Sequence, residues 1–185
     1  MVIKSDIATR RLYATDASVY EQLPLSVAFP KNTEECIALV QAASENKIPL
    51  IFRAAGTSIA GQCVGGGQVV DVSRFLTCIF GEPSENQIRV QPGVIHSDLD
   101  LFLKPFSLKF APEISTSNRC MIGGMIGNNA AGSHSVIYGT TREHVVAIEA
   151  LLSDGTVVEF GPLTDEQLEA KCTLPTLEGE IYRTV

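Results

Sequence analysis

Residues 49–62 read PLIFRAAGTSIAGQ, a short apolar run that passes into a loop of small and hydroxyl-bearing residues. A second loop of similar character, MIGGMIGNNAAGS, occupies residues 121–133. Small residues let a ligand approach the backbone closely, and they permit the positive φ angles at which consecutive N–H groups converge on an anion. Two such loops in one chain indicate a long phosphate-bearing ligand that is held at two places.

The first loop follows a strand–helix–strand pattern. Residues 26–29 and 49–53 are short apolar strand candidates, and between them Asn32 and Glu35 have the spacing of a helix N-cap and its N3 partner. A short connection of this kind predicts parallel strands and a right-handed crossover. With residues 68–72 as a further buried strand, we expect a small α/β lobe of about three strands.

The later part of the chain has the pattern of a mainly antiparallel lobe. Residues 87–91 alternate with period two, as a half-exposed strand does. Asp154-Gly155 lies between two β-rich runs, residues 145–152 and 156–160, which predicts a hairpin. Further helices are expected with Ser97 as a cap, and over residues 122–131, 164–171 and 177–183.

These patterns predict an α+β fold and a division of the chain into three parts. Residues 1–23 are mixed and polar and form an N-terminal arm, residues 24–85 form a first lobe, and residues 86–185 form a second lobe. The last helix candidate stops at Val185 without a cap or a following element. We therefore interpret the chain as a piece of a larger protein in which the second lobe is incomplete.

The composition excludes several classes of protein. Of 185 residues, 45% are hydrophobic and 19% charged, with a net charge of −7, which is typical of a globular domain. Lys and Arg form no cluster, which argues against a nucleic-acid partner. No apolar run approaches the roughly 18 residues of a membrane span, and the first residues lack the apolar stretch that is typical of a signal peptide. We expect a cytoplasmic protein, with a peripheral contact to the inner membrane as the alternative.

The five cysteines are widely spaced, odd in number and without a C-x-x-C pair. This pattern disfavours a metal site or a disulfide framework and favours reduced thiols in the cytosol.

Each glycine-containing loop also fits a purely structural interpretation when it is taken alone. The first has neither the Gly-Lys-Ser/Thr of a P-loop nor a G-x-G-x-x-G fingerprint. In the second, Asn128 and Asn129 can donate and accept hydrogen bonds, which would fix either the loop itself or the edge of a ligand. A non-catalytic nucleotide-binding or structural α/β module is therefore an alternative to an enzyme.

The order of the motifs resembles one superfamily of flavoproteins. Residues 49–62 resemble the pyrophosphate loop of the flavoproteins related to vanillyl-alcohol oxidase and p-cresol methylhydroxylase, and residues 122–133 look like their second FAD loop. Ala54 and Ala55 stand where glycines are usual, and alanine keeps its N–H but disfavours positive φ. The resemblance spans residues 24–161 and is closest to the D-lactate dehydrogenase and glycolate oxidase FAD-subunit branch. The other matching stretches are residues 69–74, 90–94, 138–142 and 145–160.

The resemblance implies a two-lobed fold of the p-cresol methylhydroxylase type, in which FAD lies extended between a small parallel βαβ lobe and a larger, mainly antiparallel lobe with flanking helices. It implies non-covalent FAD, since none of His96, His134 and His144 lies in the first loop. The residues that it implies for cofactor binding are Ala54, Ala55, Gly56, Thr57, Ser58, Gly61, Gln62, Pro112, Met121, Gly123, Gly124, Asn128, Gly132, Ser133 and Ile148.

The activity implied by the resemblance is an FAD-dependent oxidation of a 2-hydroxy acid such as D-lactate or glycolate. In that family the base and the arginine that holds the substrate carboxylate come from a later substrate domain, so we name no catalytic residue and expect this chain alone to be inactive. Residues 114–121 resemble long members with an iron–sulfur module, which would lie outside this chain because the cysteines lack cluster spacing. A sugar-nucleotide reductase of the same superfamily is the nearer alternative.

Overall fold

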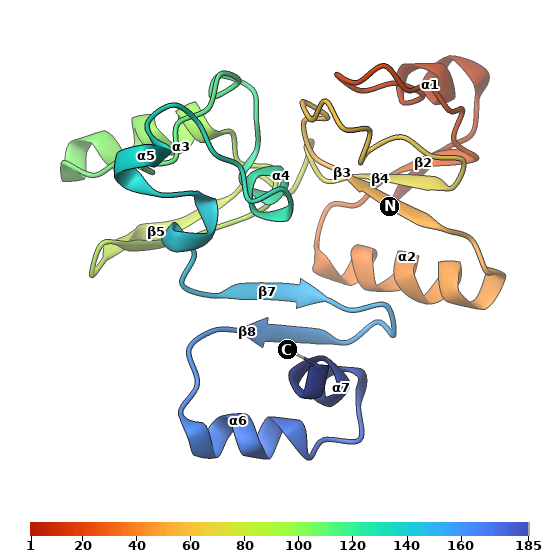
Figure 1. Ribbon diagram of the computed structural model, residues 1–185. Coiled ribbons are helices and arrows are strands. Elements are labelled where there is room, and N and C mark those ends of the chain that lie inside the picture. The colour runs from red at the N-terminus through yellow and green to blue at the C-terminus, as the bar shows by residue number, and fades with distance from the viewer. Residues whose placement is uncertain (185) are drawn as a thin grey trace.

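The computed structural model describes residues 1–184 and shows two lobes, with a β-hairpin and two helices beneath them in the view of Figure 1. The first lobe carries a four-stranded sheet of order β1-β2-β4-β3. Its elements are β1 (Val2–Lys4), α1 (Ile7–Leu12), β2 (Ser26–Phe29), α2 (Thr33–Asn46), β3 (Leu50–Arg53) and β4 (Gln68–Asp71).

The parallel pairing expected for the first lobe is confirmed. Strands β2 and β3 both run parallel to β4, which lies between them, with Val27 and Ile51 each opposite Val69. Val27 and Val69 are fully buried, as the inner residues of a small parallel sheet should be. The sheet has one strand more than the sequence predicts. Strand β1 of the N-terminal arm pairs antiparallel with β2. Its three residues are all exposed, and they lack the alternation of buried and exposed positions that would predict a strand.

Helix α2 begins as predicted, with the Asn32 side chain accepting a hydrogen bond from the Glu35 N–H at 2.9 Å. The Glu35 carboxylate reaches back one residue further than a capping box requires, because it accepts the N–H of Lys31 at 2.9 Å. The helix ends at Asn46, and the Lys47 that follows it has a left-handed φ of 54°. Its buried face packs on the sheet and forms the core of the first lobe with Ala28 and Val70.

The second lobe contains a hairpin followed by short helices. Its first elements are β5 (Ile79–Ser84), β6 (Gln87–Val90), α3 (His96–Leu103), the 3-10 turn η1 (Lys104–Phe106), α4 (Ile122–Gly127), α5 (Ser135–Tyr138) and the 3-10 turn η2 (Thr141–His144). Glu85 and Asn86 form the β5–β6 turn with positive φ at both positions, as a two-residue type I′ turn requires. The expected division of the chain between residues 85 and 86 falls inside this turn.

Two local features of the second lobe differ from the sequence expectation. Strand β5 was not predicted, because it contains Gly81 and Pro83, which usually mark loops, and its pairing is irregular there. The prediction of Ser97 as a helix cap is wrong, since Ser97 lies within α3. The early N–H groups of this helix, those of His96 and Ser97, donate instead to the carbonyls of Cys120 and Ser117, both at 3.0 Å.

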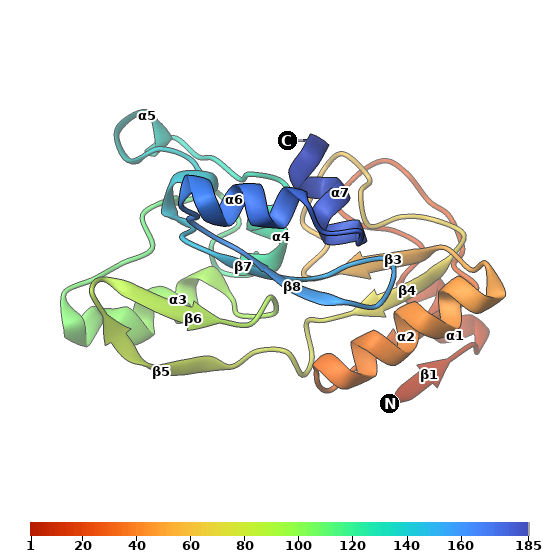
Figure 2. The ribbon, with the colours of Figure 1, turned by 90° about the horizontal axis from the view of Figure 1, so that it is seen from below.

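The Asp154-Gly155 hairpin is confirmed and it lies alongside both lobes. It joins β7 (Ile148–Leu151) to β8 (Val157–Phe160) antiparallel, and Gly155 has a φ of 86°. Leu151 packs against the core of the first lobe. Helices α6 (Asp165–Cys172) and α7 (Leu177–Thr184) cover the other side of the hairpin in both views (Figures 1 and 2), close to the predicted ranges.

Candidate functional site

The first glycine loop (residues 54–62) and the second glycine loop (residues 121–133) meet at one cavity. The Cβ position of Gly124 in α4 lies 3.8 Å from the Ala54 Cβ. Gln62 Nε2 donates a hydrogen bond to Asn128 Oδ1 at 2.8 Å, so the two loops are also joined directly. The cavity has a volume of about 1450 Å³, which exceeds the roughly 300–1,000 Å³ of common small-molecule pockets. It can therefore accommodate a ligand that is longer than most metabolites.

Backbone donors without acceptors characterise the first glycine loop. Among residues 1–184, none accepts a hydrogen bond from the N–H groups of Ala55, Gly56, Thr57 or Ser58. All four residues are half-buried and line the cavity. Consecutive backbone N–H groups that the protein leaves unpaired on a cavity wall are a fitting cradle for an anion.

The backbone of this loop explains why Ala54 and Ala55 are compatible with it. The positive φ angles fall on Gly56 (67°) and Gly61 (78°), whereas both alanines keep ordinary φ values. Alanine disfavours only the positive-φ region and still presents its N–H. The departure from the usual glycines therefore leaves the donors in place.

The two adjacent glycines of α4 have different roles. A Cβ on Gly123 would lie 2.5 Å from the Pro92 Cβ, so Gly123 permits close packing, and its N–H donates to the Pro92 carbonyl at 2.9 Å. The Gly124 N–H finds no acceptor within residues 1–184, and the nearest atom to its Cβ position is that of Ala54. Gly124 is thus the residue whose bare backbone a ligand can approach.

Most residues predicted for the cofactor site lie on the wall of this cavity. Those that line it are Ala54, Ala55, Gly56, Thr57, Ser58, Gln62, Met121, Gly123, Gly124, Asn128 and Ile148.

Four predicted residues do not line the cavity. Gly61 packs against the ring of Tyr20, and Pro112 is fully buried. A Cβ on Gly132 would lie 1.7 Å from the Glu113 carbonyl oxygen, so this glycine serves a close backbone crossing. Ser133 is exposed beyond the cavity wall.

Charged and aromatic groups that the sequence did not assign to the cofactor site complete the wall. Arg89 in β6 and Glu149 in β7 form an ion pair with a nitrogen–oxygen distance of 2.5 Å, and both side chains line the cavity. His144 also lines it, with Nε2 donating to the Tyr138 carbonyl at 2.6 Å and the ring edge against Phe110. No local sequence signal marks these residues as cavity-lining, because the register of the hairpins and the path of the chain between the elements decide which side chains reach the cavity.

The other two histidines, His96 and His134, make contacts outside the cavity. His96 is buried, with Nε2 at 3.2 Å from the Phe110 carbonyl oxygen, and exposed His134 pairs with Glu113 at 2.9 Å. Neither of them lines the cavity.

The part of the chain that the structure describes holds no group of three or more His, Cys, Asp or Glu that could bind a metal. All five cysteines are free thiols, and burial raises the pKa of Cys36 to about 11 and also raises that of Cys63. The Cys36 and Cys63 thiols are therefore protonated at neutral pH. No helix of residues 1–184 has the length and apolar character needed to cross a membrane.

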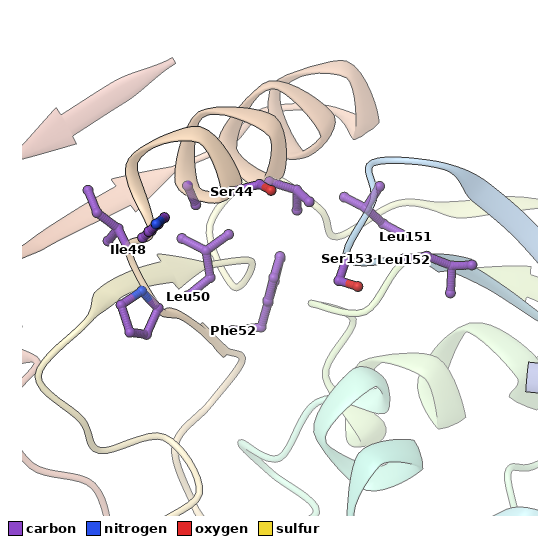
Figure 3. Close-up of a pocket in the computed structure, with 11 residues that line it drawn as sticks. Ser44, Ile48, Leu50, Phe52, Leu151, Leu152 and Ser153 are labelled. Atoms are coloured by element: carbon purple, nitrogen blue, oxygen red, sulfur yellow. The ribbon is translucent and has the colours of Figure 1, made fainter. Parts of the chain in front are cut away.

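A smaller cavity of about 500 Å³ lies between the end of α2, strand β3 and the tip of the β7–β8 hairpin (Figure 3). Apolar side chains such as Leu50, Phe52 and Leu151 form much of its lining, and none of the residues predicted for cofactor binding reaches it. The larger cavity, with its unpaired backbone donors, is therefore the candidate site.

Comparison with known proteins gives one family and a set of relatives. Residues 24–161 match the family described as "FAD binding domain". The chain is 41% identical over 182 residues to a D-2-hydroxyglutarate dehydrogenase of Escherichia coli (strain K12), an alignment that covers 96% of this chain and 18% of that protein. It is 32% identical over 157 residues to the glycolate oxidase subunit GlcD of Bacillus subtilis (strain 168), covering 83% of this chain and 33% of that protein. The chain thus spans a third or less of the length of these relatives.

Solved structures confirm the two-lobed α+β fold. An alkyldihydroxyacetonephosphate synthase superposes with a TM-score of 0.76 at 17% identity, over 89% of this chain and 32% of that one. A xylooligosaccharide oxidase from Myceliophthora thermophila superposes with a TM-score of 0.73 at 19% identity, over 86% of this chain and 34% of that one.

Proposed function

This chain belongs to the family of FAD-binding domains, and from that premise we propose that it holds FAD non-covalently between its two glycine loops. The observation that carries the proposal is the run of unpaired N–H groups from Ala55 to Ser58 on the wall of a cavity that the second glycine loop also lines. A diphosphate needs several convergent donors, and backbone N–H groups supply them without a cation.

The residues present fit the cofactor. The N–H groups of Ala55–Ser58 and the hydroxyl of Thr57 would hold the diphosphate, while the bare backbone of Gly124 would allow the cofactor to approach α4. Asn128 and Gln62, bonded to each other, would close the site between the loops. Ile148, the first residue of β7, lines the cavity and would be a further contact for the cofactor.

We also propose that the whole protein is an oxidoreductase that acts on a 2-hydroxy acid. Support comes from the relatives named D-2-hydroxyglutarate dehydrogenase and glycolate oxidase subunit, since 2-hydroxyglutarate and glycolate are both 2-hydroxy acids. When bound, FAD supplies a two-electron acceptor for the hydride equivalent of the alcohol carbon. The role of this chain is to bind and orient that group, and we assign no catalytic residue to it.

The remaining parts of this proposal concern organisation. The two lobes would supply the two sides of the FAD site, with the second beginning at β5 rather than at residue 86, and with the arm of residues 1–23 attached to the first. A substrate domain, and an iron–sulfur module if the protein has one, would be supplied outside this chain. Five free thiols support a reducing, cytoplasmic location.

The test is a titration of the purified chain with FAD, followed by flavin fluorescence, with FMN as the control ligand. Saturable binding of FAD but not of FMN is expected, because FMN lacks the diphosphate and the adenosine. A folded chain that does not bind FAD would contradict the proposal.

Gly124→Ala is the matched variant for this titration. The added Cβ meets no protein atom closer than 3.8 Å, and alanine favours a helix by about 1 kcal/mol over glycine, so the fold should be kept. The same Cβ would stand where the cofactor approaches, so FAD affinity should fall by about tenfold, or about 1.4 kcal/mol. Ala131→Val, in the same loop but exposed and off the cavity wall, should bind like the unchanged chain.

A further inference from the structure

We propose that residues 13–22, which lie outside the family match, form part of the FAD site because they hold the first glycine loop in its binding conformation. We call this segment the N-terminal clamp. The inference rests on the function proposed above, and it assigns positioning roles to residues that the sequence marked only as a polar arm.

The clamp is a closed loop with a shape of its own. The Gln22 N–H donates to the Ala14 carbonyl at 2.9 Å, and Thr15 pairs with Glu21 as an isolated bridge, so the two ends of the segment lie together. Within it, Asp16 Oδ1 accepts the Ser18 N–H at 2.8 Å. Burial of the Asp16 carboxyl opposes its ionisation, but the hydrogen bonds from Ser18, together with the Cys63 N–H and the charge of Arg53, outweigh this and lower its pKa. The internal geometry of the clamp is thus set by its own hydrogen bonds.

The tip of the clamp holds the peptide that follows Gly56. The Ala17 N–H donates to the Gly56 carbonyl at 3.1 Å. In a trans peptide the carbonyl of one residue and the N–H of the next point in opposite directions. The bond to Ala17 therefore also aims the Thr57 N–H away from the clamp, and this N–H is one of the unpaired donors on the cavity wall.

Arg53 links the clamp to the strand from which the loop emerges. Its Nη1 donates to the Thr15 carbonyl at 2.7 Å, and its guanidinium carbon lies 5.3 Å from the centroid of the Tyr13 ring. The same guanidinium packs against Gly56, since a Cβ there would lie 2.7 Å from Arg53 Nη2. Gly56 is thus held between the clamp and an arginine that the clamp itself orients.

Tyr20 supports the far end of the loop. A Cβ on Gly61 would lie 2.5 Å from Tyr20 Cδ2, so the ring rests directly on the Gly61 backbone. Tyr20 is 58% exposed, and its contribution to the protein core is therefore small. Its role is to cover the loop, which makes it a suitable position for a test that leaves the core intact.

The base of the clamp is anchored to the central part of the sheet. Tyr13 Oη donates to Asp71 Oδ2 at 2.5 Å, and Asp71 at the end of β4 is 2% exposed. Burial, together with this bond, raises the pKa of Tyr13 to about 12, so the hydroxyl is a donor at neutral pH. Through this anchor the glycine loop is held on a rigid element, and less ordering remains to be done when an anion binds.

The experiment compares Tyr20→Ala with Tyr20→Phe in the full chain. The Ala variant should lose about tenfold in affinity for FAD and, by the same factor, for ADP, because the clamp acts on the diphosphate loop and both ligands carry a diphosphate. The Phe variant keeps the ring and should bind both like the unchanged chain. Equal FAD affinity in the Ala variant would overturn the proposal.

A second readout needs no cofactor and separates the clamp from the proposed function. In the free chain, hydrogen exchange of the Ala17 amide, whose N–H donates to the Gly56 carbonyl, should be faster in Tyr20→Ala than in Tyr20→Phe, with equal melting temperatures. If the unchanged chain fails to bind FAD, the proposed function is wrong. The exchange rates still test whether the clamp holds the first glycine loop. Unchanged exchange in Tyr20→Ala would refute it.

Ala17 gives an independent pair of variants. Ala17→Pro removes the N–H that the Gly56 carbonyl accepts, whereas Ala17→Ser keeps it. Weaker FAD binding is expected for the Pro variant only. If a low melting temperature shows that the Pro variant is unfolded, the comparison of Tyr20→Ala with Tyr20→Phe alone tests the role of the clamp.

Discussion

Gln62 and Asn128 are 66 residues apart in the sequence, and their side-chain amides join the two glycine loops through a hydrogen bond of 2.8 Å. Gln62 belongs to the first lobe and Asn128 follows α4 in the second. The bond therefore links the two surfaces that are proposed to hold FAD.

We expect Gln62→Ala and Asn128→Ala each to weaken FAD binding. The double variant should bind FAD as tightly as the single variant that has the lower affinity. A coupling energy of about 0.5–1.5 kcal/mol between the two positions would match a single net hydrogen bond. The measurement is a double-mutant cycle on FAD dissociation constants. Asn118→Ala, an exposed asparagine away from the cavity wall, is the matched control, and additive effects of the Gln62 and Asn128 variants would count against the link.

Gly56→Val should lower stability as well as ligand affinity. Gly56 has a φ of 67°, and its Cβ position lies 2.7 Å from the Arg53 guanidinium, so a branched side chain would strain the backbone and displace Arg53. The cost of a β-branched residue in this region is about 1–3 kcal/mol. Urea unfolding of the free chain measures it, and Gly124→Ala serves as the comparison that should keep its stability. A Gly56→Val chain of unchanged stability would show that the loop relaxes freely.

Alkaline pH should loosen the anchor of the clamp. The folded-state pKa of Tyr13 is raised from 10 to about 12, chiefly by burial and then by the Asp71 carboxylate. For an acid with a raised pKa, the stabilising contribution is complete below pH 10 and is lost as the pH rises toward 12. The free energy of unfolding should therefore fall between pH 10 and 12 more steeply than in Tyr13→Phe. Parallel curves for the two chains would contradict the assignment, and Tyr20→Phe controls for a tyrosine outside the anchor.

Acid should weaken the turn of the β7–β8 hairpin. The Asp154 carboxylate accepts the Thr156 hydroxyl at 2.6 Å and the Thr156 N–H at 2.9 Å, and these bonds lower its pKa below 3.8. A lowered carboxyl pKa gives stability that is present above pH 3.8 and is lost as the pH falls through the folded-state value.

Relative to Asp154→Asn, the unchanged chain should therefore lose stability as the pH falls below about 4, as followed by urea unfolding. Thr156→Val removes the hydroxyl donor and should reduce this difference. A difference that is as large in the Thr156→Val background would mean that another carboxylate is responsible.

The sequence predicted those parts of the fold whose signals are local. Asn32 caps α2 because a side chain and an N–H three residues away suffice for the bond, and Gly155 turns the β7–β8 hairpin because glycine tolerates positive φ. Strand β1 and strand β5 escaped prediction. The first is held at a sheet edge by backbone pairing with little burial, and the second contains Gly81 and Pro83.

By itself, the sequence determined that this chain is an FAD-binding domain with two glycine-rich loops, because the order and spacing of short motifs are properties of the chain. Only the tertiary structure decided at which small residues the backbone is accessible from the cavity. Gly124 faces the cavity, whereas Gly132 packs directly against the backbone of Glu113. It also brought the N-terminal clamp onto Gly56 and Gly61. Such contacts join segments that are distant in sequence, and no local propensity encodes which distant atoms will meet.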